Sequence, residues 1–154
     1  MATEPKPSVQ RLVFASAEEV EQHFYDAIKN CDIDALMQAW ADDEDIICIH
    51  REGKRLLGPK QVHNSWRDIL TQNCKFSVER KDKRVINSGM TVIHVMLEKI
   101  TQTTAEGLIE SVCHATNIYQ KDSRGWHLVM HMATTAPCTY IDQVEAKNFP
   151  GYFH

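Results

Sequence analysis

Five of the eight histidines lie in segments with apolar neighbours, and a neutral imidazole with a pKa of about 6.5 can act as a base near neutral pH. They are His50, His63, His94, His114 and His131. In the run from Asp45 to His50, alternation puts Ile46, Cys48 and His50 on one face of a strand. We therefore predict His50 as the catalytic residue, able to take a proton alpha to a carbonyl group and return it elsewhere. The alternative is that each imidazole is a hydrogen-bonded core residue.

Aromatic side chains near His50 in sequence could line an apolar cavity, which is the usual setting for a small-molecule site. They are Phe24, Tyr25, Trp40 and Trp66. Tyr25 or Asn117 could orient a substrate. The same aromatic residues could equally fill the core.

Familiar cofactor motifs are absent from the sequence. The segment from Gly53 to Lys60 approaches a phosphate loop, but Pro59 stands where the lysine is needed. His127 and His131 lie in a strand pattern, too far apart to share a metal ion. The acidic run 42–45 lacks the spacing of a calcium loop, and the five cysteines form no CxxC pair. We predict no cofactor and no metal site.

The composition is that of one globular domain. The chain has 154 residues, 43% hydrophobic, with 17 basic against 21 acidic side chains and a net charge of −4. Without a basic run, neither nucleic acid nor an anionic membrane is an expected partner. Without an apolar run long enough for a membrane span or a signal peptide, a cytoplasmic location is expected.

The first half of the chain shows helical spacing. Ser16 and Glu19 form a capping box that predicts a helix over residues 17–30, and Asp32 caps a second helix that reaches about Ala41. A strand at 45–50 follows. Gly58 and Pro59 then begin a third helix that ends near Asn73.

From Cys74 onward the period falls to about 2, which predicts four antiparallel strands separated at 87–89, 103–107 and 121–125. Loss of phase predicts a bulge near Lys81–Arg84. The strands carry apolar residues on both faces, although three helices can cover only one. We therefore predict a homodimer through the exposed sheet face.

Three parts of the chain are expected: a flexible lead-in at residues 1–15, a domain at 16–137, and a C-terminal tail at 138–154 that docks on the domain. Within the lead-in, Leu12 to Phe14 could dock on the body.

Four segments together resemble the SnoaL-like proteins of the nuclear transport factor 2-like superfamily. They are residues 31–44, Ile47-Cys-Ile-His50, Gly58 with Ser65-Trp66, and Gly125-Trp-His-Leu-Val-Met-His-Met-Ala133. The resemblance covers residues 16–137. It implies an α+β fold in which three N-terminal helices pack in a strongly curved, cone-shaped antiparallel sheet with an apolar pocket at its open end.

Two members of the superfamily suggest different functions. Ketosteroid isomerase is similar over residues 31–44, but Phe24 stands near its helix-one tyrosine, Ala115 near its strand-borne acid and His50 near its general base, which disfavours steroid isomerisation. The association domain of calcium/calmodulin-dependent protein kinase II, which forms rings and performs no chemistry, is similar over residues 58–70 and 126–137. Its pocket arginines correspond to Glu98 and Asn117.

The sequence thus predicts a homodimer that binds a small, largely apolar molecule, with isomerase- or cyclase-type proton transfer as an open question. A non-catalytic association module is the alternative. The predicted ligand-binding residues are Phe24, Tyr25, Trp40, Trp66, His94, Ala115, Asn117 and Met130.

Overall fold

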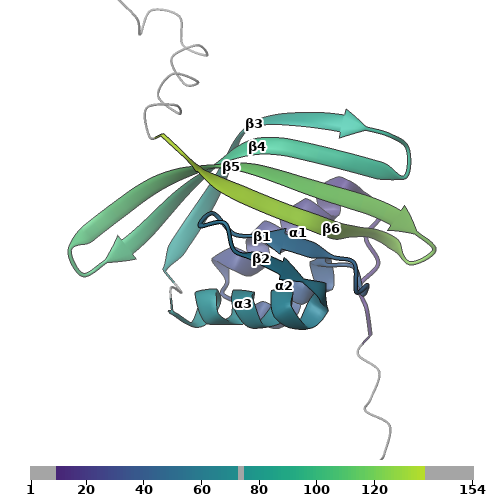
Figure 1. Ribbon diagram of the computed structural model, residues 1–154, viewed down its shortest axis with the longest axis horizontal. Helices are drawn as coiled ribbons and strands as arrows, with labels where there is room; N and C mark the ends of the chain where they lie inside the picture. The colour runs from purple at the N-terminus through teal and green to yellow at the C-terminus, as the bar shows by residue number, and fades with distance from the viewer. Residues whose placement is uncertain (1–9, 73–74, 138–154) are drawn as a thin grey trace, which may run out of the picture.

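The computed structural model describes residues 10–72 and 75–137, and Figure 1 shows three helices lying beneath one curved sheet. The elements in chain order are α1 (Ala17–Lys29), α2 (Ile33–Ala39), β1 (Ile47–Ile49), β2 (Arg55–Leu57), α3 (Gly58–Gln72), β3 (Phe76–Asn87), β4 (Thr91–Thr104), β5 (Gly107–Asp122) and β6 (Gly125–Ala136). The predicted α+β class, with three helices packed in a strongly curved sheet, is confirmed. The tail at 138–154 and the first part of the lead-in lie outside the described residues.

The helices begin where their caps were predicted. The Ser16 hydroxyl accepts a hydrogen bond from the Glu19 backbone N–H (3.2 Å), and the Glu19 carboxylate accepts one from the Ala15 N–H (2.8 Å). Asp32 caps α2 by accepting from the Ala35 N–H (3.0 Å). Each cap satisfies N–H groups that have no partner inside the helix, which fixes the first residue of the helix.

The sheet has six strands in the order β2-β1-β6-β5-β4-β3. Its neighbours are antiparallel except for β1 and β6, which run parallel with Ile47 opposite Met130. The sequence predicted neither β2 nor this parallel pair. Strand β2 has three residues and buries only Leu56, so it is too short for a periodic signal and exists through its pairing with β1.

Two irregularities bend the long strands. The register between β3 and β4 shifts between Lys81 and Arg84, where Asp82 adopts a φ of 50°, so the predicted bulge is confirmed. A second shift, between Ile118 and Tyr119, lies on the β5–β6 pair and was not predicted. Bulges increase local twist, and the bent strands arch over the helices (Figure 1).

The end of the lead-in packs against the domain. The Phe14 ring is buried, with its centroid 5.1 Å from that of His23, and the Trp126 N–H donates to the Phe14 carbonyl (3.0 Å). A Cβ atom at Gly125 would lie 2.8 Å from that carbonyl oxygen, so the close approach requires glycine. Of the segment from Leu12 to Phe14 that was expected to dock, Phe14 is buried, whereas Leu12 and Val13 are exposed.

The two sheet faces differ in what covers them. The inner face joins the helices in one core around Val20, Phe24 and Leu128. The outer face carries apolar side chains that are half-buried or exposed, including Ile93, Val95, Ile118, Met130 and Met132. At one end of this face Leu97, Val112 and Ala136 form a small buried cluster of their own.

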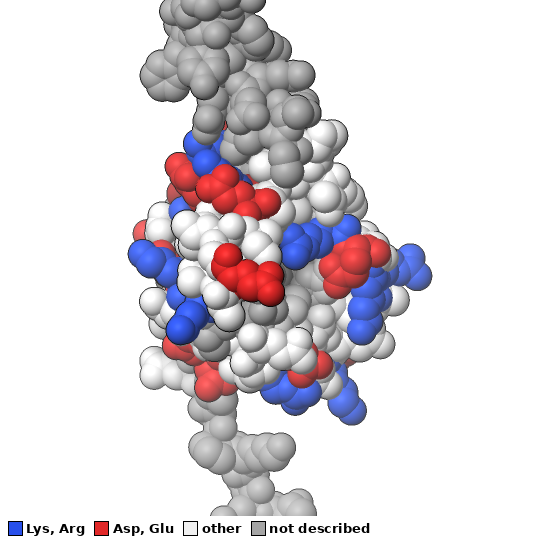
Figure 2. Space-filling model, turned by 90° about the vertical axis from the view of Figure 1, so that its left-hand side faces the viewer, with Lys and Arg blue, Asp and Glu red and all other residues white. Residues whose placement is uncertain are grey.

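Charged side chains are spread over the surface. Figure 2 shows acidic and basic groups of the described residues interspersed on one face of the molecule rather than gathered by sign. No helix of the described residues is long and apolar enough to span a membrane.

A buried carboxylate ties α1 to three strands of the sheet. Glu21 is fully buried, and its Oε1 accepts hydrogen bonds from Arg80 (2.9 Å) and Lys83 (3.5 Å) of β3. Its Oε2 meets the His94 ring of β4 and accepts from the Tyr119 hydroxyl of β5 (3.0 Å). Burial raises the pKa of Glu21, but the hydrogen bond and charge of His94, the charge of Lys83 and the Tyr119 hydroxyl outweigh it and lower the pKa to about 2.

We expect Glu21→Gln to lower the free energy of unfolding by about 2–4 kcal/mol at pH 7.5, because it leaves the buried ends of Arg80 and Lys83 without their counter-charge. Glu18→Gln is the matched control: Glu18 lies on the same helix and pairs with the same Lys83, but its side chain is 60% exposed. That change should cost less than about 1 kcal/mol. Urea unfolding measures both, and equal losses would contradict the anchoring role of Glu21.

Candidate functional site

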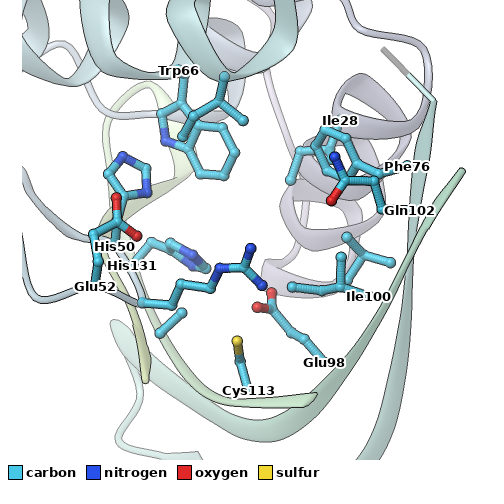
Figure 3. Close-up of a pocket in the computed structure, with 14 residues that line it drawn as sticks. Ile28, His50, Glu52, Trp66, Phe76, Glu98, Ile100, Gln102, Cys113 and His131 are labelled. Carbon is cyan, nitrogen blue, oxygen red and sulfur yellow. The ribbon is translucent and has the colours of Figure 1, made fainter. Parts of the chain in front are cut away.

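A cavity of about 260 Å³ lies between the helices and the inner face of the sheet. Its apolar wall comes from α1, α3 and the long strands, with Ile28, Trp66, Ile69, Phe76, Val78, Ile100 and Ala133. Its polar lining consists of His50, Arg51, Glu52, Glu98, Gln102, Cys113 and His131. Figure 3 shows His50, His131 and Glu98 around the same space, with Trp66 above it.

His50 is held at this wall by the turn that follows β1. Its backbone N–H donates to the Lys54 carbonyl (3.1 Å), and its own carbonyl accepts from the Gly53 N–H (2.8 Å). The ring Nε2 lies 2.6 Å from the Ser65 hydroxyl of α3, and the ring centroid lies 5.1 Å from that of Trp66. Burial lowers the pKa of His50, so the imidazole is neutral at pH 7 and capable of accepting a proton.

The opposite polar wall is a hydrogen-bonded chain of four buried side chains. The Tyr25 hydroxyl donates to Glu98 Oε2 (2.6 Å) and accepts from Asn117 Nδ2 (3.0 Å). Asn117 Oδ1 in turn lies 2.5 Å from His131 Nδ1. The chain runs from β4 through α1 and β5 to β6, and both of its ends, Glu98 and His131, line the cavity.

Burial shifts the pKa values of Glu98 and His131, the two ends of this chain, away from their ordinary values. It raises the pKa of Glu98 to about 7, because the Tyr25 hydrogen bond and the Arg80 charge offset only part of the desolvation. Burial, with a smaller effect of the His50 charge, lowers the pKa of His131 to about 3. Glu98 therefore exchanges a proton near neutral pH, which suits a general acid or base, whereas His131 stays neutral.

The buried thiols near the cavity are not nucleophiles. Burial raises the pKa of Cys48 to about 12 and also raises that of Cys113. Because the thiolate is the reactive form, these cysteines are inert at neutral pH.

The structure separates the predicted site residues into three groups. His50 and Trp66 line the cavity, while Tyr25 and Asn117 stand behind it and hold Glu98 and His131. The remaining predicted residues contribute no lining: Phe24, Trp40 and Ala115 are core residues, His94 contacts Glu21, and Met130 lies on the outer face opposite Ile47.

Glu98 and His131 were not predicted as site residues. Alternation along β4 would have put Glu98 on the same face as His94 and Met96. The burial of this carboxyl group depends on a hydrogen bond from Tyr25 of α1, and alternation along one strand cannot predict a partner on a distant helix.

Among the described residues, one cluster has the side chains of a metal site: Glu18, Glu21 and His94, whose ligand atoms lie within 4.8 Å of one another. Arg80 and Lys83 already neutralise this cluster through Glu21. Two fixed cations against the same carboxylate disfavour the binding of a third.

The sequence matches the SnoaL-like domain family over residues 17–137. The chain belongs to this family. Its three helices and curved sheet are therefore those of a SnoaL-like domain, as the sequence resemblance implied. A search of curated proteins gives no match.

Solved structures of the same superfamily share the fold. A protein described as a calcium/calmodulin-dependent protein kinase type II association domain from Thiobacillus denitrificans is 28% identical, with a TM-score of 0.76 over 82% of this chain and 100% of that one. A protein described as a dehydratase of the nuclear transport factor 2-like family from Streptomyces avermitilis is 22% identical, with a TM-score of 0.71 over 77% and 93%. A calcium/calmodulin-dependent protein kinase II hub from S. rosetta is 22% identical, with a TM-score of 0.62 over 80% and 100%.

The raised pKa of Glu98 predicts a stability change with pH. Between the ordinary value of 4.5 and the folded value of about 7, the folded protein keeps a proton that the unfolded chain has lost, so Glu98 contributes less stability as pH rises. Glu98→Gln cannot ionise. We expect its free energy of unfolding to rise relative to wild type by about 2–3 kcal/mol between pH 5 and 8.

Urea unfolding at several pH values measures this difference. Glu106→Gln, at an exposed turn between β4 and β5, is the control and should follow the wild-type pH profile. Parallel profiles for Glu98→Gln and wild type would show that Glu98 ionises as an ordinary carboxyl group.

Proposed function

We propose that this SnoaL-like protein binds a small, largely apolar molecule in its cavity, with His50 beside the polar group of the ligand. The observation that supports this most directly is the unmet hydrogen-bonding capacity of the cavity wall. Trp66 is buried with its ring against His50, and its indole Nε1–H meets no nitrogen or oxygen acceptor among the described residues; its side-chain partner is the Cys48 sulfur, a weak acceptor. An oxygen or nitrogen acceptor on a bound molecule would be a stronger partner for this buried donor.

The size of the cavity limits the ligand. A cavity of about 150 Å³ holds benzene, so one of about 260 Å³ suits a molecule of roughly ten non-hydrogen atoms. The wall of aromatic and aliphatic side chains favours an apolar body with few polar groups.

Proton transfer at His50 is part of the proposal. The ring is neutral, and its contact with Ser65 fixes its orientation. With a carbonyl compound in the cavity, His50 would remove an alpha proton and return it elsewhere, as in an isomerase or cyclase. A cytoplasmic location, expected from the sequence, accompanies this proposal.

The neutral probe 2-phenylethanol tests the binding site. We expect it to raise the melting temperature of the wild type, and we expect His50→Ala to weaken its binding at least fivefold, because the polar end of the cavity loses its imidazole. His63→Ala is the matched control, since His63 lies on α3 outside the cavity lining, with its ring Nδ1 3.2 Å from the Asn64 side-chain oxygen. Calorimetric titration gives both affinities; unchanged binding to His50→Ala would remove His50 from the site.

We also propose that two copies pair through the outer sheet face. In support, this face carries half-buried apolar side chains on three central strands, and two of the similar structures are described as an association domain and a hub. An apolar face of this kind is what a self-complementary interface requires. The same pairing serves the alternative function, a non-catalytic association module.

Ile118→Glu tests the pairing, because Ile118 lies at the centre of the outer face, between Ile93 and Met130 in the sheet register. A charge there should convert the dimer into a monomer in sedimentation velocity at micromolar concentration. Lys60→Glu, an exposed charge reversal on α3, should leave the assembly unchanged. A wild-type protein that is already a monomer would contradict the pairing.

A further inference from the structure

When Glu98 is ionised, Glu98 and His131 present hydrogen-bond acceptors at their end of the cavity. We propose that this end of the cavity selects a small molecule whose polar group is a protonated amine, bound between Glu98 Oε1 and His131 Nε2. This inference rests on the proposed function and specifies the ligand of the same site.

The directions of the hydrogen bonds support this assignment. An amide nitrogen can only donate and an amide oxygen can only accept, so Asn117 donates to Tyr25 and accepts from His131 Nδ1. The Tyr25 proton therefore points to Glu98 Oε2, and His131 is left with an unprotonated Nε2. Glu98 Oε1 and His131 Nε2 have no hydrogen-bond partner among residues 10–72 and 75–137.

The surrounding charges leave this end of the cavity negative or neutral. The titratable and charged groups that face Glu98 or lie along the same wall are Tyr25 and Glu21 of α1, Arg80 of β3, Cys113 of β5, His131 of β6, and His50, Arg51 and Glu52 of the turn after β1.

The two arginines among these groups are already engaged. Arg80 donates to Glu21 and Gln22, and it lies over the Tyr25 ring with its guanidinium carbon 4.7 Å from the ring centroid. Arg51 is exposed, donates to the Ser111 hydroxyl (2.9 Å) and is followed in sequence by the acidic Glu52.

Both imidazoles of the wall are neutral, because burial lowers the pKa of His50 and of His131. Among the described residues that line the cavity, Arg51 is the one lysine or arginine, and it contacts the Cys113 thiol and the Ser111 hydroxyl rather than Glu98. A cationic ligand gains from the ionised form of Glu98.

The pH dependence of binding follows from the pKa of Glu98, which is about 7. Below pH 7 the amine must displace the proton from Glu98, so its affinity falls as the pH is lowered, and each binding event releases protons. Above pH 7 the carboxylate is already formed and the affinity levels off. An anionic ligand would show the opposite sign.

Three probes with one skeleton separate these possibilities: 2-phenylethylamine, 2-phenylethanol and phenylacetate. Their charges are constant between pH 5.5 and 7.5. At pH 7.5 we expect the amine to bind at least tenfold more tightly than phenylacetate, and to lose about 25-fold in affinity at pH 5.5 as Glu98 becomes protonated. Titration calorimetry in buffers of different ionisation enthalpy would also detect the released proton.

Two variants test whether Glu98 is the source of the amine affinity and of its pH dependence. Glu98→Gln should weaken amine binding at least tenfold and remove its pH dependence. Tyr25→Phe removes the donor that favours the ionised carboxyl group, so it should move the midpoint of the pH dependence upward while the preference for the amine persists above that midpoint. Glu106→Gln should bind the amine as the wild type does.

The outcomes distinguish this inference from the proposed function. If 2-phenylethanol binds but phenylacetate binds as tightly as the amine, or amine affinity does not change with pH, the amine specificity is wrong and the small-molecule site stands. If none of the three probes binds, both proposals are contradicted.

Discussion

The rotation of α1 about its own axis inside the curved sheet is the constraint on which the cavity depends. Glu21 fixes that rotation, because its carboxylate is held at once by β3, β4 and β5. Tyr25 lies one turn further along the helix and Ile28 about two turns, so all three share one face. With Glu21 bound, Tyr25 meets Glu98 and Ile28 reaches the cavity wall. The ion-pair network around Glu21 thus positions the side chains of α1 that build the cavity.

Two buried glutamates on facing elements have pKa values shifted in opposite directions. The cause is the set of groups around each carboxylate, because both are buried. Glu21 is surrounded by Arg80, Lys83 and His94, which keep it charged in spite of desolvation. Glu98 receives one phenolic hydrogen bond and the charge effect of its cross-strand neighbour Arg80, which together do not offset desolvation. The charged carboxylate stabilises the fold, and the titrating one is suited to a reaction or a ligand.

The sequence predicted what depends on local pattern. Caps at Ser16 and Asp32, the bulge before Arg84 and the inward direction of His50 are set by neighbouring residues, and the structure confirms them. The burial of Glu98 instead depends on a hydroxyl group distant in sequence, and local pattern cannot show whether a charged residue in an apolar strand has such a partner. For the same reason, no local pattern indicated that His94 would contact Glu21 instead of lining the cavity.

The parallel contact between β1 and β6 has a consequence for how the protein acquires its site during synthesis. The long hairpins β3 to β6 join segments that are adjacent in the chain, and such pairings close early at small entropic cost. Strand β1, in contrast, pairs with β6, which is the last strand of the domain in sequence, so this pairing forms only after β6 is available. On the ribosome, the nascent chain can assemble its arch of hairpins strand by strand, but the imidazole after β1 reaches its place only when the last strand has emerged.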